Sequence, residues 1–475
     1  MTGICAYGVY IPLYRLALSE IAAATGGFAQ DGEKAVANFD EDSITMATEA
    51  ALCCLNSKNE TDRATVQGLY FATTTSPFKE KQSAVTISTA LDLASEIQTL
   101  DSFGSLRSGT NALRAALDTV KAGSADKIMV ATADCRLGYP QSALEELFGD
   151  GAAALLIGDT DVAVEIEERF SLADEITDLW RRDEDRFVRM WEDRFNLLQG
   201  FQRVVKDAVQ KAVLKFGIDL SEISKVVYYA PNARAHTALA KAIGLNYKNQ
   251  VQTPLFDVLG NTGTASTFIQ LAAALDEAKP GDRILMASYG NGCDVFLLKV
   301  TDLIKDVQNG MQVKDMIASK KMLPNYHKYL NLRDLLQTEH SRQPAINTPA
   351  TLLWREQESL LRFYAGKCKE CGNLQYPALQ ICAKCASKRK GGKIRLSDQQ
   401  AEVFLSTIDT LGFGGESSPA WAIADMPAGL RIRLQVADCE AIEDVPPGTK
   451  LNPTFRKFKR QGDTPVYFWK LKLPR

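Results

Sequence analysis

The alternation of strand-like and helical segments over residues 1–303 constrains the fold of this chain most strongly. Short apolar runs such as KIMVATADC (127–135) and RILMASYG (283–290) have the length and composition of buried strands. Between such runs lie segments with helical periodicity, among them NALRAALDTVKAG (111–123) and FQRVVKDAVQKAVLKFG (201–217). Strands separated by helices predict an α/β fold in which helices cover a largely buried sheet.

The organisation changes after residue 303. Residues 304–352 are polar and lose the pattern, apart from a helical segment in YHKYLNLRDLLQ, so we expect a linker or docking segment there. Residues 353–395 contain a helix and a cysteine cluster. Residues 396–475 contain the β-type runs AEVFLSTIDTLGF, LRIRLQVADC and TPVYFWKLKL without helices between them. Such runs close most simply into a small β-barrel.

Four cysteines form two C-x-x-C pairs that are separated by ten residues: Cys368, Cys371, Cys382 and Cys385. Four thiolates on two tight turns satisfy tetrahedral zinc and leave no open position for water, so this spacing predicts a structural zinc site. A thiol redox pair or free surface cysteines are the alternatives, and the spacing favours zinc. Ten cysteines in 475 residues are too few for a disulfide scaffold.

The charge balance and the apolar runs exclude several classes of partner. The chain has 55 basic and 58 acidic residues and a formal charge of -3, with no basic block, so we expect no nucleic-acid partner. The amino terminus lacks the pattern of a signal peptide, and no apolar stretch reaches the length of a membrane span. We therefore expect a cytoplasmic protein without membrane contact.

Seven motifs follow one another along residues 1–303: AYGVYIPLYR, FDEDSITMATEAA, DLWRRDEDRFVRMWEDRF, GDGAAALLIGD, YYAPNARAHTALAKAIGL, LGNTGTAS and SYGNG. Together they resemble hydroxymethylglutaryl-CoA synthase and ketoacyl synthase III of the thiolase superfamily. The resemblance implies two packed βαβαβ halves, a five-layered α-β-α-β-α core, and a homodimer or higher homo-oligomer. From about residue 353 the chain resembles the zinc-ribbon plus OB-fold proteins that accompany thiolases and bind acyl-CoA, here fused in the same chain.

The chain departs from this family at the three positions that carry its chemistry. In DSFGSLRSGT, Leu106 occupies the position of the nucleophilic cysteine, with Ser105 beside it. Tyr229 stands where the family has its histidine, and Thr74 where it has its glutamate. The asparagine of the G-N-T motif is retained as Asn261. The resemblance therefore implies catalytic roles for Tyr229 and Asn261, with Ser105 as a candidate nucleophile.

The resemblance also implies that a CoA thioester is the substrate. The residues expected to line its site are Thr74, Asn232, Tyr289 and Gly290. His236 follows Tyr229 by seven residues and is expected on a helix, facing solvent.

Each candidate also has a purely structural interpretation. Ser105 fits an ordinary turn, because no histidine base is evident beside it. Tyr229 could fill a core, and a G-N-T turn explains Asn261 without catalysis. Small-residue packing explains Cys135 and Cys293 better than a displaced nucleophile does.

A leucine cannot hold an acyl group, so we predict an aldolase-type lyase or synthase that acts on a β-hydroxyacyl-CoA without an acyl-enzyme. Tyr229 would take the β-hydroxyl proton, and Asn261 would stabilise the acyl-CoA enolate. Thiolase-like aldolases of steroid side-chain breakdown look most similar. Two alternatives remain open. One is a synthase-like condensing enzyme or acyltransferase that uses Ser105 or a displaced cysteine, and the other is an inactive acyl-CoA-binding subunit that supports an active thiolase partner.

Overall fold

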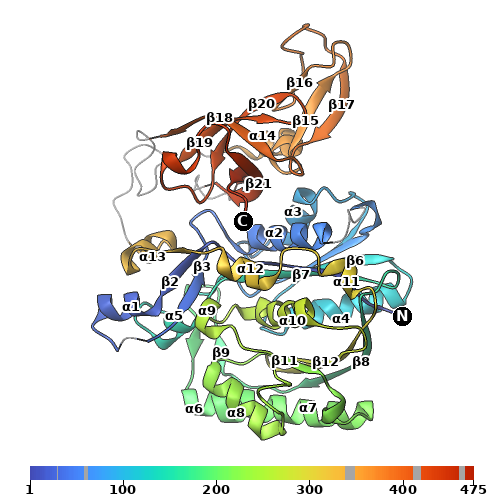
Figure 1. Cartoon of the computed structure of the whole chain (residues 1–475), viewed down its shortest axis with the longest axis vertical. Helices are drawn as coiled ribbons and strands as arrows, with labels where there is room; N and C mark the ends of the chain where they lie inside the picture. The colour runs from blue at the N-terminus through green and yellow to red at the C-terminus, as the bar shows by residue number, and fades with distance from the viewer. Residues whose placement is uncertain (29, 58–62, 337–347, 410–418, 459–465) are drawn as a thin grey trace. The chain divides into compact units, whose positions relative to one another are not determined.

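The computed structural model describes the chain outside residues 29, 58–62, 337–347, 410–418 and 459–465. The described chain divides into two compact units (Figure 1). The first contains residues 1–37, 42–88 and 93–329, and the second contains residues 38–41, 89–92 and 330–475.

A nine-stranded mixed sheet forms the centre of the first unit, in the order β11-β12-β13-β8-β1-β7-β6-β4-β5. β1 pairs with β7 along most of its length but with β8 only through Gly3 and Ile4, so two half-sheets meet at a narrow junction. The strands are β1 (Gly3–Tyr10), β4 (Gly68–Ala72), β5 (Gln98–Ser102), β6 (Lys127–Asp134), β7 (Gly151–Gly158), β8 (Val164–Ala173), β11 (Lys225–Tyr228), β12 (Arg283–Tyr289) and β13 (Gly292–Val300).

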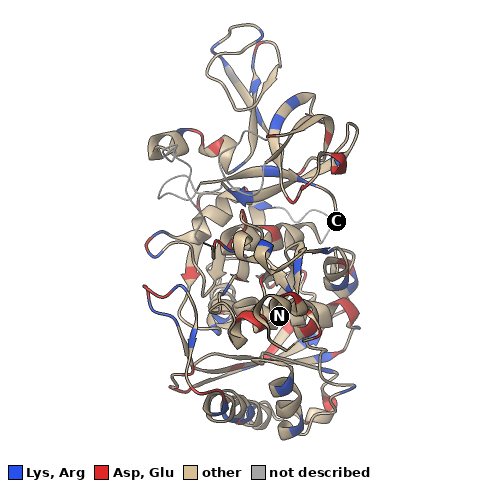
Figure 2. Cartoon of the chain, turned by 90° about the vertical axis from the view of Figure 1, so that its left-hand side faces the viewer, with Lys and Arg blue, Asp and Glu red and all other residues tan. Residues whose placement is uncertain are grey.

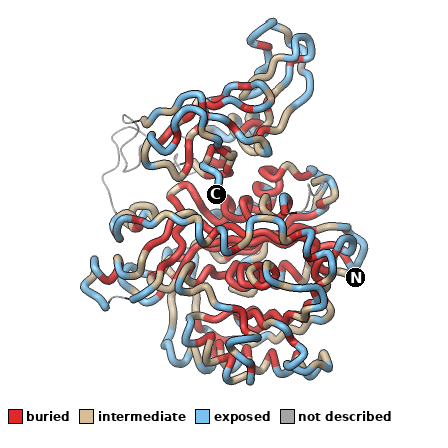
Figure 3. The backbone as a smooth tube through the Cα atoms, viewed as in Figure 1, coloured by how far each residue is buried: buried red, intermediate tan, exposed pale blue. Residues whose placement is uncertain are grey.

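Helices cover both half-sheets and fill the space between them (Figure 1). α10 lies between the half-sheets, and nine of its 12 residues are buried, including the polar residues Ser266, Thr267 and Gln270. Figure 3 shows the buried residues concentrated in these strands and in the central helices. The α/β prediction is therefore confirmed. The main helices are α2 (Ser43–Asn56), α3 (Ser83–Ala90), α4 (Ser108–Lys121), α7 (Arg203–Phe216), α8 (Ala233–Ile243) and α10 (Ser266–Glu277).

The remaining elements of the first unit are short. α6, a π-helical segment and α7 follow one another without a break, and such π segments are frequent at functional sites. The short elements are β2 (Tyr14–Ala17), α1 (Leu18–Thr25), β3 (Glu33–Val36), η1 (Arg63–Thr65), α5 (Ala143–Leu147), β9 (Leu179–Trp180), β10 (Arg189–Met190), α6 (Asp193–Phe195), the π segment η2 (Asn196–Gln202), η3 (Leu220–Glu222), α9 (Phe256–Leu259) and η4 (Gly263–Ala265).

The segment expected as a linker begins within the first unit. Residues 304–329 form α11 (Ile304–Val307), α12 (Val313–Ala318), β14 (Lys321–Met322) and the start of α13 (Tyr326–Leu332). β14 pairs in parallel with β2, and α11 and α12 each bury two apolar side chains, Ile304 and Val307 in α11 and Val313 and Met316 in α12. These spaced apolar residues attach the segment to the first unit, although its overall composition is polar. Residues 337–347 of the expected linker lie outside the described residues.

The second unit contains a three-stranded sheet and a closed five-stranded barrel, with barrel order β18-β19-β20-β22-β21. Buried and exposed residues alternate along β20, as expected for a strand with one face toward a core. The predicted small barrel is confirmed, while residues 410–413 and 464–465 of the predicted runs lie outside the described residues. The elements are α14 (Ala350–Arg355), α15 (Gln357–Leu360), β15 (Tyr364–Cys368), β16 (Leu374–Gln375), β17 (Lys390–Arg395), β18 (Ala401–Ile408), β19 (Ala420–Met426), β20 (Leu430–Val436), η5 (Ile442–Asp444), β21 (Lys450–Lys457) and β22 (Tyr467–Lys472).

Charged residues of both signs occur throughout each unit (Figure 2). This distribution agrees with the near balance of acidic and basic residues in the sequence. Among the residues that the structure describes, no helix combines the length and apolar character that crossing a bilayer requires.

Candidate functional site

A buried polar cluster lies at the carboxyl ends of two strands in the first unit. Arg136 follows β6, Tyr229 directly follows β11, and Asn261 lies between α9 and η4. All three side chains are at most 5% exposed. Residues far apart in the sequence therefore meet at strand ends, where ligand sites of α/β proteins are usually found.

The side chain of Asn261 is held in one orientation by its hydrogen bonds. Its Oδ1 accepts from the Arg136 guanidinium at 2.6 Å and from the Gly263 N–H at 3.1 Å. Both groups only donate, so the oxygen must face them and Nδ2 must point the other way. Nδ2 donates to Tyr229 Oη at 3.0 Å and to the Pro231 carbonyl at 3.2 Å.

Arg136 is a buried cation next to this amide. Its guanidinium lies over the Phe148 ring, 4.1 Å from the ring centroid. None of the ion pairs found among the described residues includes Arg136, and its Nε is buried without a hydrogen-bond partner there. Its positive charge therefore acts on Asn261 and on the neighbouring tyrosine.

The Tyr229 phenol lies among aromatic rings. Tyr289 stacks beside it with ring centroids 6.3 Å apart, and Phe201 meets it edge-on at 6.4 Å. Burial raises the pKa of the Tyr229 phenol, and the charge of Asp178 adds to this rise. The Arg136 charge and the Asn261 hydrogen bond act in the opposite direction on that pKa. The environment therefore keeps the phenol protonated while providing groups that stabilise its anion.

The segment before α4 places Leu106 against this aromatic cluster. Leu106 is half-buried and packs against the apolar cluster that contains Tyr229 and Tyr289. Ser105 is also half-buried, and its Oγ accepts a hydrogen bond from the Arg107 N–H at 3.2 Å. No basic side chain contacts Ser105 Oγ in the described part of the chain, so the structure provides no general base for this hydroxyl.

Gly290 allows a close approach of two backbone segments at this point. A Cβ on Gly290 would lie 2.7 Å from the Arg107 nitrogen and 3.1 Å from the Leu106 nitrogen. The turn after β12 therefore rests directly on the backbone at the start of α4. A side chain at this position would push the two segments apart.

Tyr289 forms a second hydrogen-bonded pair beside Tyr229. Its Oη donates to Asp178 Oδ2 at 2.6 Å, and burial followed by the Asp178 charge raises the pKa of its phenol. A Cβ on Gly200, in the π segment, would lie 2.8 Å from Tyr289 Oη. The π segment therefore packs on the Tyr289 hydroxyl through a residue that must remain small.

Asp134, at the end of β6, ties two loops of the site together. Its carboxylate accepts hydrogen bonds from the Thr73 hydroxyl at 2.9 Å, the Thr74 N–H at 2.7 Å and the Thr264 N–H at 2.8 Å. The hydroxyl of Thr74 is buried and makes no hydrogen bond in the described part of the chain. Thr74 thus lies in a loop that Asp134 holds against the G-N-T loop.

Two other predicted positions have mainly structural contacts. Asn232 caps the amino terminus of α8, and its Oδ1 accepts from the Ala235 N–H at 2.9 Å. The prediction that His236 faces solvent is wrong, because His236 is fully buried and stacks on Tyr228 with centroids 4.2 Å apart. Burial lowers the pKa of His236 to about 4, so the imidazole is neutral near pH 7.

The two cysteines considered as displaced nucleophiles differ in their environments. Cys293 is fully buried, and burial raises the pKa of its thiol well above the usual range. Cys135 is half-buried next to Arg136, with its Sγ 3.8 Å from the Thr75 hydroxyl. Cys135 is the more accessible of the two.

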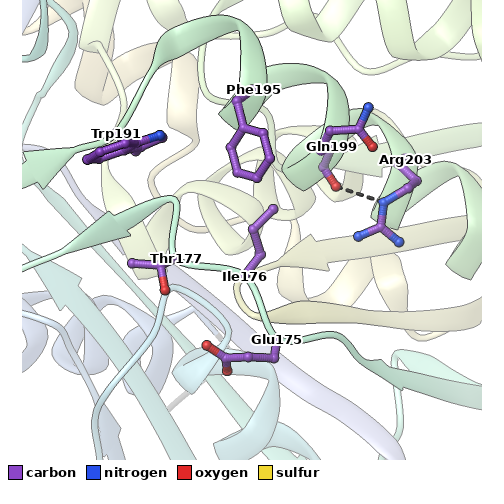
Figure 4. Close-up of a pocket in the computed structure, with 7 residues that line it drawn as sticks. All are labelled: Glu175, Ile176, Thr177, Trp191, Phe195, Gln199 and Arg203. Atoms are coloured by element: carbon purple, nitrogen blue, oxygen red, sulfur yellow. Dashed lines mark hydrogen bonds between the residues drawn. The ribbon is translucent and has the colours of Figure 1, made fainter.

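Figure 4 shows the residues that line an open pocket with a volume of about 780 Å³. The pocket lies near the Tyr289 and Asp178 pair, because Ile176 of its wall, Tyr289 Oη and Asp178 Oδ2 all lie within 3.7 Å of a Cβ placed on Gly200. Ile176, in the wall of this pocket, packs close to Gly200 of the π segment, since a Cβ added to Gly200 would lie 3.4 Å from Ile176 Cδ1. Trp191 is 67% exposed in this pocket, which is a high value for an indole ring. The lining residues are Glu175, Ile176, Thr177, Trp191, Phe195, Gln199 and Arg203.

The second unit brings the four cysteines of the C-x-x-C pairs together. Their sulfur atoms all lie within 4.8 Å of one another. Cys368 and Cys385 have sulfurs 3.6 Å apart, as do Cys371 and Cys382. Tetrahedral zinc with bonds of about 2.3 Å requires sulfurs about 3.8 Å apart, so this donor set fits a zinc ion.

Comparison with known proteins identifies the family. Residues 214–298 match the model described as 3-oxoacyl-[acyl-carrier-protein (ACP)] synthase III C terminal. The hydroxymethylglutaryl-CoA synthases of Thermococcus gammatolerans and Pyrococcus horikoshii are 30% and 31% identical to this chain over 338 residues, covering 70% of this chain and 95% of each relative. The chain belongs to the hydroxymethylglutaryl-CoA synthase family.

Solved structures agree with this family at the level of the fold. "MvaS in complex with 3-hydroxy-3-methylglutaryl coenzyme A" superposes with a TM-score of 0.62 at 21% identity, covering 73% of this chain and 94% of that chain. The 3-oxoacyl-[acyl-carrier-protein] synthase III of Aquifex aeolicus superposes with a TM-score of 0.57 at 25% identity, covering 63% of this chain and all of the other. This member of the hydroxymethylglutaryl-CoA synthase family therefore has the thiolase-like fold that its motifs implied.

Sequence reasoning predicted Tyr229 and Asn261 as site residues, and the structure places their side chains in contact, but it did not single out Arg136 and Asp178. Both missed residues carried a weak signal. Arg136 is a charged residue directly behind a buried strand, and Asp178 opens the motif DLWRRDEDRFVRMWEDRF. In this hydroxymethylglutaryl-CoA synthase family member, the fold is needed to show that Arg136 contacts Asn261 and that Asp178 contacts Tyr289.

Proposed function

We propose that this protein is a condensing enzyme of the hydroxymethylglutaryl-CoA synthase type, which forms a carbon–carbon bond between acyl groups delivered as CoA thioesters. The observation that carries this proposal is the buried cluster of Arg136, Asn261 and Tyr229 beside the start of α4. The names of its relatives support condensation, so this alternative replaces the aldolase-type lyase as the first choice.

Tyr229 would act as the proton donor of the bond-forming step. The enolate of the enzyme-bound acyl group, formed when its α-proton passes to water, would attack the carbonyl carbon of a 3-oxoacyl-CoA, whose oxygen then becomes an alkoxide that needs a proton. The Tyr229 phenol would supply that proton, and the resulting phenolate would be stabilised by the Asn261 N–H and the Arg136 charge. The open pocket beside Tyr289 is the proposed entrance for the acyl-CoA.

The acyl carrier in this reading is Ser105 or Cys135. The acyl carbon would bond to Oγ or Sγ, and its bond to the CoA sulfur would break, with CoA leaving as the thiol after it takes the proton. After the condensation, water would hydrolyse the bond to Oγ or Sγ, which frees the product as a carboxylate that still carries the second CoA and restores the hydroxyl or thiol. Ser105 stands just before α4, where helix N–H groups favour developing negative charge. Cys135 offers the more nucleophilic atom and lies beside Arg136.

Acyl transfer can be tested by mass spectrometry. The protein is incubated with acetyl-CoA and a panel of 3-oxoacyl-CoAs, and both products and intact protein mass are followed. We expect a condensed acyl-CoA product and an acyl adduct, which peptide mapping assigns to Ser105 or Cys135. The variants Ser105→Ala and Cys135→Ala identify the carrier, because only one of them should lose the adduct.

Leu106 favours a second candidate, an aldol or retro-aldol reaction without an acyl-enzyme. In the retro-aldol direction the phenolate form of Tyr229, which the Arg136 charge and the Asn261 N–H stabilise, takes the β-hydroxyl proton, the Cα–Cβ bond breaks, and the products are a carbonyl compound and an acyl-CoA enolate that is then protonated. Turnover of β-hydroxyacyl-CoAs with no adduct at any time would select this reaction. CoA binding without turnover would instead select an inactive subunit that supports an active thiolase-family partner.

We also propose that Cys368, Cys371, Cys382 and Cys385 hold one structural zinc ion, and that the barrel is an OB-fold domain that contacts acyl-CoA. The four sulfurs leave no place for water, so zinc there would stabilise the fold without entering the reaction. Metal analysis should find about one zinc per chain. We further propose that the protein is a cytoplasmic homodimer. Light scattering of the purified protein measures its molar mass and so tests the oligomeric state.

A further inference from the structure

Arg136 connects the end of β6 to the two side chains proposed to act on the substrate. Burying a guanidinium without a carboxylate partner is costly, so its retention needs a compensating interaction. Its strongest contact is the 2.6 Å hydrogen bond to Asn261 Oδ1, and its guanidinium lies flat over Phe148. A buried cation that has no carboxylate partner among the described residues is suited to a negative charge that forms only during reaction.

We propose that Arg136 is a positioning residue that fixes the orientation of Asn261 and stabilises the negative charge formed on the Tyr229 oxygen. This inference rests on the proposed function, in which Tyr229 gives up a proton to the substrate. It adds a residue that the family motifs and the sequence analysis did not single out.

The orientation of Asn261 depends on Arg136 because the amide has two different ends. Arg136 and the Gly263 N–H hold Oδ1, which leaves Nδ2 to donate to Tyr229. Without Arg136, a single backbone N–H at 3.1 Å would hold the oxygen. The amide would then be free to rotate, and its N–H would point at Tyr229 for a smaller fraction of the time.

The charge on Tyr229 depends on the groups that face it. These are Arg136 from the end of β6, Asn261 from the G-N-T loop, Asp178 from the segment before β9, and the stacked phenol of Tyr289. Burial and Asp178 raise the pKa of Tyr229, whereas Arg136 lowers it. Removing the cation leaves the raising effects less opposed, so the phenol becomes a weaker acid.

The variants Arg136→Met and Arg136→Lys separate packing from charge. Methionine keeps apolar contact with Phe148 and removes the charge, whereas lysine keeps a charge and loses the planar fork. We expect Arg136→Met to lower kcat by roughly 10²-fold with a much smaller change in KM, and Arg136→Lys to recover part of the rate. A kcat of Arg136→Met equal to that of the parent would overturn the inference.

The pH profile gives a readout that a merely structural role would not move. A proton donor must be protonated, so kcat falls as pH rises through the pKa of Tyr229 in the enzyme–substrate complex. Loss of Arg136 raises that pKa, and the alkaline limb should therefore move to higher pH. An unchanged alkaline limb together with a reduced plateau would indicate a packing role only and would refute the charge assignment.

A measurement without substrate keeps this inference separate from the proposed function. Both the parent and Tyr229→Phe are titrated to high pH, and the absorbance of tyrosinate is recorded. Subtracting the curve of Tyr229→Phe from that of the parent isolates the ionisation of Tyr229. The same pair of titrations, with and without Tyr229→Phe, is repeated in proteins that carry Arg136→Lys or Arg136→Met. The ionisation of Tyr229 should shift to higher pH in the Arg136→Met pair only. If the parent shows no condensation, the proposed function fails, while equal ionisation in all three pairs overturns the role of Arg136.

Discussion

Replacing Tyr229 with phenylalanine removes one oxygen atom from the centre of the site. The ring contacts with Tyr289 and Phe201 remain, because they involve carbon atoms. Asn261 Nδ2 loses its 3.0 Å bond to Oη but keeps the Pro231 carbonyl at 3.2 Å. One hydrogen bond is therefore lost, and the free energy of unfolding should fall by about 1 kcal/mol.

The effect on the reaction should be much larger than the effect on stability. Loss of a general acid costs roughly 10²–10⁴-fold in kcat, which corresponds to about 3–5 kcal/mol in the activation barrier. Initial rates of condensation of acyl-CoA substrates give kcat and KM, and urea unfolding gives the stability of the same preparation. The expected result is a large fall in kcat at nearly unchanged stability.

The neighbouring tyrosine provides a matched control. Tyr228 is also buried, and its hydroxyl donates to the His236 carbonyl at 2.7 Å instead of contacting Asn261. Tyr228→Phe should therefore cost about the same in stability and leave kcat within a few-fold of the parent, roughly the spread expected for a variant away from the chemistry. Equal rate losses in the two variants, or full activity in Tyr229→Phe, would refute the proton-transfer role.

Four further predictions follow from contacts described above. Asn261→Ala should lower kcat by roughly 10²–10³-fold with little change in KM, measured in the same assay. Gly200→Ala should displace the Tyr289 hydroxyl, because the new Cβ would lie 2.8 Å from it. A crystal structure of the variant should show the displaced hydroxyl, and kcat should fall. Gly200→Ser should have a larger effect on both. The pKa of His236 is about 4 in the folded protein and about 6.5 in the unfolded chain, so unfolding between these pH values takes up a proton. The free energy of unfolding should therefore fall by about 3 kcal/mol from pH 6.5 to pH 4. Denaturant titrations at each pH measure this fall, and His236→Phe should remove it. Cys382→Ser should lose zinc in metal analysis and expose the second unit to protease, and intact protease resistance without metal would contradict a structural zinc.

The sequence predicts the layers of the first unit because buried strands and amphipathic helices have different periods. It predicts Tyr229 and Asn261 because each belongs to a motif in a recognisable place. The pairing of Asp178 with Tyr289 joins residues 111 positions apart, and only the packing of the π segment and β12 creates it. No local pattern in the sequence contains that information.

His236 illustrates an error that the sequence itself could have corrected. In α8 the buried residues Ala235, His236, Leu239 and Ala240 recur at helical spacing, so His236 shares the apolar face of the helix. Its position seven residues after Tyr229 was a poorer guide than this periodicity. Arg136 had no comparable pattern, since a lone arginine after a strand is equally typical of a solvent-exposed loop.

The narrow junction between the two half-sheets has a consequence for the order in which the chain can assemble during synthesis. β1 is synthesised long before its partner β7, because Gly3 pairs with Gly158. Its second partner, β8, follows with Glu165 opposite Gly3. Until those strands leave the ribosome, the apolar first strand has no sheet to join and its backbone groups stay open to other chains. Completion of the sheet centre therefore depends on a long-range closure, which favours slow folding of the first unit.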